Sequence, residues 1–143
     1  MAVFDNLDIE NFLGLVLEES TIQQVKETLC AKGISFKEYS DQIVFPYRLG
    51  NVDWGCTISF EKGVICLVTL DVYSPDSYSI YKTLCKELSE RYRSNFEITN
   101  SQDKQDGTET MNFTSKNDFF RFTEIVYDSS PILGQKNVYI KYF

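Results

Sequence analysis

Apolar and polar residues alternate along most of this chain in two successive blocks, each of which begins with the pattern of an amphipathic helix. The first block covers residues 13–73 and the second covers residues 75–143. In both, apolar residues spaced three and four apart predict a helix, and later runs with an apolar residue at every second position predict strands. The order of helix, four strands, helix and four strands predicts an α+β fold. We expect a single domain with an internal pseudo-repeat, its helices packed on one face of a twisted antiparallel sheet.

Both predicted helices have recognisable starts. Ser20 and Gln23 have the spacing of a capping box, and Gly33 suits the left-handed position after a helix end. The first helix is therefore predicted over residues 21–32. The second is predicted to begin around Ser74 and to end near Tyr92.

The clearest strand signal lies between residues 52 and 73. The positions predicted to face the core are Val52, Trp54, Cys56, Ile58, Phe60, Val64, Cys66, Val68, Leu70 and Val72. Between the two runs, residues 61–63 end in Gly63, which favours a hairpin loop. The register pairs implied by this loop are Phe60 with Val64, Ile58 with Cys66, and Trp54 with Leu70.

The remaining strands are predicted from weaker alternation. They cover residues 34–39, 43–49, 96–99, 108–115, 119–127 and 136–143, with a polar loop at 100–107. Pro46 cannot donate a ladder hydrogen bond, so its strand is predicted to lie at an edge of the sheet or to be interrupted there.

The face of the hairpin opposite the core is more apolar than a fully solvated surface would be. It carries Ile65, Leu67 and Tyr73 beside polar residues. One interpretation is that the N-terminal arm (residues 1–17) or a loop covers this face. The other is a partner-binding patch with an apolar centre. The candidate partner-binding residues are Leu67 and Tyr73, then Asp53 and Asp71.

Composition narrows the class of partner. The 143 residues carry a formal net charge of -7, and the sequence has no basic stripe, so nucleic acid is an unlikely partner. The longest apolar run, residues 12–17, is far short of the ~20 residues of a membrane helix.

The N-terminus has acids where a secretion signal has bases, which favours a cytoplasmic protein unless a leader has been removed. The four cysteines are predicted to be reduced, because their spacing contains no CxxC pair.

Catalytic motifs are absent from the sequence. There is no histidine, which excludes Ser–His–Asp and Cys–His arrangements. No glycine-rich phosphate loop is present, and the acidic residues of the 100–107 loop do not have calcium-loop spacing. We therefore expect no metal, no cofactor and no enzymatic activity, although a histidine-free enzyme that uses carboxylates or a tyrosine stays open as the weakest alternative.

The start of the first block resembles proteins of the β-lactamase-inhibitor-protein type. The residues that carry the resemblance are Leu13-Gly14, Ser20-Thr21, Gln24-Val25 and Gly33. The same outline is similar to small lipoproteins of outer-membrane assembly. This resemblance implies short helical elements stacked on an antiparallel sheet, sometimes in tandem, and a function in binding proteins. The lipoprotein leader with its acylated cysteine and the disulfide spacing of the secreted inhibitors are absent, so no functional residue is carried over.

Two hypotheses for function follow. The leading one is a non-catalytic protein-binding module of the inhibitor or immunity type, which blocks another protein by occlusion. The alternative is a small-molecule-binding protein with an apolar pocket between sheet and helices. The residues predicted to line that pocket are Phe45, Trp54 and Tyr81.

Overall fold

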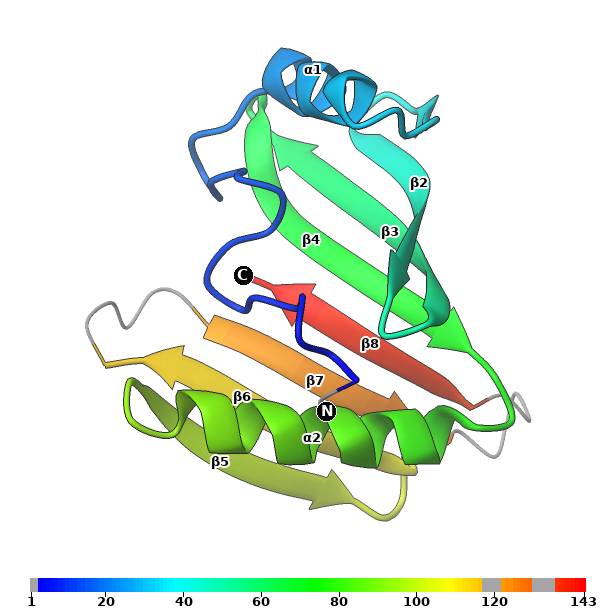
Figure 1. Cartoon of the computed structure of the whole chain (residues 1–143), viewed down its shortest axis with the longest axis vertical. Helices are drawn as coiled ribbons and strands as arrows, with labels where there is room; N and C mark the ends of the chain where they lie inside the picture. Colours follow the sequence, from blue (N-terminus) through cyan, green and yellow to red (C-terminus); the bar gives the residue numbers. More distant parts are fainter. Residues whose placement is uncertain (1–2, 117–121, 130–135) are drawn as a thin grey trace.

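The computed structural model describes residues 3–116, 122–129 and 136–143, which form two helices and eight strands (Figure 1). In the first half these are α1 (Ile22–Ala31), β1 (Lys37–Glu38), β2 (Gln42–Leu49), β3 (Val52–Glu61) and β4 (Val64–Tyr73). In the second half they are α2 (Ser77–Tyr92), β5 (Phe96–Asp103), β6 (Thr108–Ser115), β7 (Phe122–Asp128) and β8 (Asn137–Tyr142). The predicted order of elements is confirmed.

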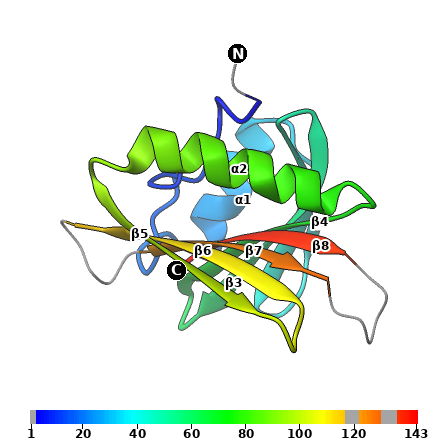
Figure 2. The same cartoon turned by 90° about the horizontal axis from the view of Figure 1, so that it is seen from below.

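The eight strands form one antiparallel sheet in the order β1-β2-β3-β4-β8-β7-β6-β5. Each half contributes a four-stranded meander, and the two meanders join through their last strands, with Leu70 on β4 opposite Ile140 on β8. Both helices lie on the same side of the sheet, as Figure 2 shows. The predicted α+β class with helices packed on one face of an antiparallel sheet is therefore confirmed.

The helix starts differ slightly from the predicted ones. Thr21, not Ser20, is the N-cap of α1, and it forms a capping box with Gln24. The Ser20 hydroxyl instead accepts a hydrogen bond of 2.8 Å from the N–H of Val16 and so closes the turn before the helix. α2 begins at Ser77 because residues 74–76 form a turn in which the N–H of Ser77 bonds to the carbonyl of Ser74.

The β3–β4 hairpin is present, but its predicted register is wrong. The turn consists of Lys62 and Gly63 alone, with φ angles of 54° and 82°, as in a type I′ turn. A β-bulge between Ser59 and Phe60 then shifts the pairing. The pairs formed are Phe60 with Ile65, Ile58 with Val68, and Cys56 with Leu70, in place of Phe60 with Val64, Ile58 with Cys66, and Trp54 with Leu70.

The bulge changes which side chains near the turn are buried. Ile65, predicted to face outward, is fully buried, and Cys66, predicted to face the core, is exposed. The bulge adds one residue and so restores the predicted alternation beyond it. Trp54 and Leu70 accordingly lie in the core, 1% and 0% exposed.

The strands at the two edges of the sheet differ most from the prediction. β1 has two residues rather than six, so most of β2, including Pro46, lies at an open edge as expected. At the other edge β5 continues to Asp103, and the predicted 100–107 loop shrinks to a turn. The predicted start of the seventh strand at residues 119–121 lies outside the described residues.

The N-terminal arm lies on the helix face of the sheet, between α1 and α2 (Figure 1). Its apolar side chains Phe4, Leu7, Ile9 and Phe12 belong to the core. Arg91 of α2 holds the arm by donating hydrogen bonds of 2.6 Å to the carbonyl of Leu7 and 3.0 Å to that of Phe4. The interpretation that the arm covers the opposite face of the sheet is therefore wrong.

Candidate functional site

The side of the sheet turned away from both helices, which we call the open face, carries all four predicted partner-binding residues. Leu67, Asp71 and Tyr73 alternate along β4, and Asp53 lies on the neighbouring β3. Tyr73 is 62% exposed, whereas Leu67 and Asp71 are half-buried by their neighbours. Since side chains two apart on a strand share a face, the structure brings these residues together on one surface.

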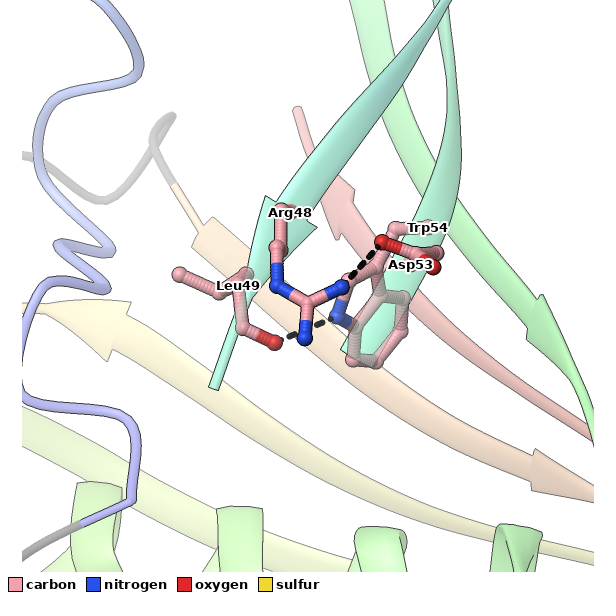
Figure 3. Close-up of polar contacts among 4 residues, drawn as sticks. All are labelled: Arg48, Leu49, Asp53 and Trp54. Carbon is pink, nitrogen blue, oxygen red and sulfur yellow. Dashed lines mark hydrogen bonds and ion pairs between the residues drawn. The ribbon is translucent and has the colours of Figure 1, made fainter. Parts of the chain in front are cut away.

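Asp53 is held by a neighbour near the β2–β3 turn. Its carboxylate pairs with the guanidinium of Arg48 at 2.8 Å, and both side chains are largely exposed (Figure 3). Solvent screens such a pair, so it orients Asp53 more than it stabilises the fold.

Asp71 lies at the middle of the open face without a cationic partner among the described side chains, whose ion pairs are Lys26 with Glu38 and Arg48 with Asp53. Burial raises the pKa of its carboxyl group. Its neighbour on β3 is Gly55, where an added Cβ would meet only the Asp71 carbonyl oxygen, at 3.8 Å. The glycine leaves this flank of Asp71 without a covering side chain.

On its other side Asp71 lies opposite Tyr139 of β8, which sequence reasoning missed. Asn137 donates a hydrogen bond of 3.0 Å to the Tyr139 hydroxyl. The pKa of this tyrosine is raised by burial first and then by the charges of Asp71 and Asp128. Tyr139 alternates with core residues of the last strand, so the sequence predicts that its side chain faces outward. Its position beside Asp71, however, depends on the pairing of β4 with β8.

The open face is therefore aromatic and aliphatic at its centre and acidic overall. Val126 of β7 continues the apolar row beyond Tyr139. The carboxylates of β3, β4 and β7 on this face belong to Asp53, Glu61, Asp71, Glu124 and Asp128. The basic side chains of the described strands on this face are those of Lys37, Arg48 and Lys141. Arg48 binds Asp53, and the Nζ of Lys141 lies 5.4 Å from the centre of the Tyr139 ring.

The alternative pocket residues are packed within the core, Phe45 and Trp54 on the neighbouring strands β2 and β3 and Tyr81 on α2. Phe45 and Trp54 are 2% and 1% exposed, and the Trp54 indole donates a hydrogen bond of 3.0 Å to the carbonyl of Leu49 (Figure 3). The ring of Tyr81 on α2 packs against that of Tyr127 on β7, with 5.8 Å between the ring centres. Neither Phe45 nor Trp54 lines any of the cavities described below.

A cavity of about 320 Å³ does lie on the helix face, between the N-terminal arm and the sheet. The arm contributes residues 9–12 and 14–17, and the sheet contributes Ile65, Val68 and Tyr142 among others. Two hydrogen bonds fasten the arm at its rim, from the Thr123 hydroxyl to the carbonyl of Ile9 and from the Tyr142 hydroxyl to the carbonyl of Asp8.

Three of the four cysteines have thiols that stay protonated at neutral pH. None forms a disulfide, and Cys30 and Cys66 are exposed. Burial raises the pKa of the Cys56 and Cys66 thiols. It also raises the pKa of the Cys85 thiol, to about 11. These thiols stay protonated at neutral pH, and a protonated thiol is a poor nucleophile.

Within the described parts of the chain, no group of three or more His, Cys, Asp or Glu side chains is placed to hold a metal ion. The helices formed by the described residues are all too short or too polar to cross a membrane. No family model matches this sequence, and no significant match is found among curated proteins or solved structures.

Proposed function

We propose that the protein binds another protein through its open face, as an inhibitor or immunity-type module that acts by occlusion. The observation that carries this proposal is that neither helix nor the N-terminal arm covers a sheet face with apolar side chains at its centre. A β-sheet that is not covered on one side normally presents a polar surface there. An exposed Tyr73 diagonally opposite Tyr139, with Leu67 farther along the same strand, is instead typical of an interface.

The acidic surroundings of this centre favour a basic partner. Asp71 has a raised pKa and forms no ion pair with any described side chain, so a Lys or Arg side chain of a partner could pair with its carboxylate. Carboxylates at the rim would mainly speed association. An interface of about 1,200–2,000 Å² in total is sufficient for specific binding and is within the reach of an eight-stranded sheet.

The proposal contains no catalytic step and no cofactor, metal, nucleic acid or membrane. The net charge of -7 supports a protein that does not bind nucleic acid. The resemblance of residues 13–33 to the β-lactamase-inhibitor-protein type agrees with a binding role.

Affinity capture from the native cell with matched variants tests this function. We expect Leu67→Asp and Tyr73→Ala to lose a partner that the wild-type protein retains. Val16→Asp is the control, because Val16 is 41% exposed but lies on the arm, on the other side of the sheet. Retention of the partner by Tyr73→Ala and Leu67→Asp would refute the proposal. Collapse of the melting temperature in Leu67→Asp would mark that position as part of the core instead.

A second candidate function is supported by the cavity beneath the arm. Its volume of about 320 Å³ falls at the lower end of the range for small-molecule sites. The side chains that line it are mostly apolar, so a neutral, apolar ligand would fit there. This revises the location of the alternative pocket, which we expected beside Trp54.

Ligand-dependent melting shifts test this second function, because a bound ligand stabilises the native state by mass action. We expect apolar compounds to raise the melting temperature of the wild-type protein and to have no effect on Leu15→Trp, in which an indole fills the cavity. Equal shifts in both proteins would place the ligand elsewhere.

A further inference from the structure

The two edges of the sheet are protected very unequally. At one edge β1 is only two residues long, and it carries Lys37 next to the Pro46-containing β2. Short strands, lysine and proline are the usual means of preventing edge-to-edge association. At the other edge β5 runs for eight residues without proline, glycine or lysine, and most of its residues are exposed. β5 is thus an edge that can accept another strand.

The register of β5 shows which backbone groups point away from the sheet. The carbonyl of Asn95 accepts a hydrogen bond from the N–H of Lys116, so the backbone N–H and C=O of Asn95 point toward β6. Backbone groups alternate in direction along a strand. Phe96, Ile98, Asn100 and Gln102 therefore direct their N–H and C=O groups outward from the edge of the sheet.

A groove runs beside this edge on the helix face. A cavity of about 380 Å³ lies there between α2 and the strands β5 and β6. Its walls include Tyr81, Lys82 and Cys85 on α2, and Asn100, Gln102 and Met111 on β5 and β6. A strand added to β5 would direct every second side chain toward this groove.

The charges at the two ends of β5 are opposite. Arg93 and Lys116 are exposed near its start, and Arg93 has no ion pair with any described residue. Asp103 and Asp106 lie at its end, where they outnumber the single cation Lys104, and the charge of Asp103 raises the pKa of Asp106. An antiparallel copy of the same strand would place each basic start beside an acidic end.

We propose that the protein forms a homodimer in which β5 pairs antiparallel with β5 of a second copy, joining the two sheets into one of sixteen strands. Within each chain, β4 and β8 already join two meanders by the same kind of antiparallel pairing. The structure also selects a register. Thr99 lies opposite Thr99 of the second copy, and Glu97 lies opposite Ser101, so no like charges face each other.

In this register, the residues whose backbone groups point outward form hydrogen bonds with those of the second copy. Ile98 pairs with Asn100 of the second copy, and Phe96 pairs with Gln102 of the second copy. Since each such pair exchanges two bonds, about eight backbone hydrogen bonds form across the interface. The half-buried Ile98 of each copy comes to lie at the groove of the other, beside Asn100.

Analytical ultracentrifugation over a concentration series tests the dimer on the whole chain, without an unknown partner. We expect a species of twice the 16.6 kDa chain mass that dissociates on dilution. Asn100→Pro removes an outward N–H and should give a monomer with an unchanged circular dichroism spectrum, because proline is tolerated at a sheet edge. Asn100→Ser keeps the N–H and should remain a dimer.

Thr99→Lys is a second variant that does not depend on the proline. Thr99 is exposed, so the fold should tolerate lysine, yet the register places the two lysines opposite each other. The substitution also reduces the net negative charge, so general repulsion cannot account for dissociation. A wild-type monomer at up to about 1 mM, or a dimer that Thr99→Lys leaves intact, overturns the proposal. Neither result affects the open face, whose variants are tested separately.

Discussion

The placement of the N-terminal arm can be tested at Gly50, in the turn between β2 and β3. Gly50 has a φ of 60°, and a methyl group added there would overlap the ring of Phe4, which is 1% exposed. Gly50→Ala therefore has two separable effects, one from the backbone and one from the arm. The neighbouring Asn51 has a φ of 59° and provides a matched control for the backbone effect.

The expected magnitudes follow from these contacts. A left-handed alanine costs roughly 1–2 kcal/mol, and overpacking against the Phe4 ring adds about 1–3 kcal/mol. Phe4→Ala by itself should cost about 3–5 kcal/mol, because it removes a buried aromatic ring. In the Phe4→Ala background the overlap is gone. Gly50→Ala should then cost only its backbone term, which gives a coupling free energy of about 1–3 kcal/mol.

Urea unfolding of the four proteins in this double-mutant cycle measures the coupling directly. Asn51→Ala should cost the same in both backgrounds, since the described hydrogen bonds include none between Asn51 and the arm. If Gly50→Ala destabilises the wild-type protein and Phe4→Ala equally, within about 0.5 kcal/mol, the ring of Phe4 does not lie on the turn and our account of the arm is wrong.

Three further predictions concern single residues. Thr21→Ala removes the capping box of α1 and should lower the free energy of unfolding by about 1 kcal/mol in urea titrations, whereas Ser20→Ala should act on the arm turn instead. Trp54→Phe leaves the Leu49 carbonyl without its indole donor and should cost about 1–3 kcal/mol, and an unchanged urea midpoint would contradict this. Burial raises the pKa of Asp71, so the native state holds its proton more tightly than the unfolded state and loses stability as pH rises between the unfolded and folded pKa values. Asp71→Asn should therefore raise the melting temperature at pH 7 and have little effect near pH 3, and an equal change at both pH values would be inconsistent with this.

Local patterns were sufficient for most of the elements. The apolar stripe of residues 22–29 and the alternation of residues 52–60 each reflect a single period of the backbone, 3.6 residues for a helix and two for a strand. For this reason α1 and β3 end within one residue of the prediction. β5 was cut short in the prediction because an edge strand needs no apolar alternation, and residues 100–103 therefore have the composition of a loop.

The candidate site was only partly predictable. Leu67, Asp71 and Tyr73 are outward positions of one strand, and alternation alone identified them. Ile65 was misplaced because a β-bulge depends on the turn geometry and cross-strand packing rather than on apolar spacing. Tyr139 and Val126 were missed because their positions beside Asp71 depend on which strands become neighbours.

The sequence by itself determined the α+β class, the order of elements and, away from the β3–β4 bulge, which side of the hairpin strands faces the core, because these depend on periodicities within about ten residues. Only the tertiary structure decided that β4 pairs with β8, that the arm packs between the helices, and that β5 forms a long edge strand. Those features arise from contacts between residues far apart in the chain, such as Arg91 with Leu7 and Leu70 with Ile140. Such contacts form because they bury apolar surface and satisfy backbone hydrogen bonds, and no local pattern encodes which distant segments will do so.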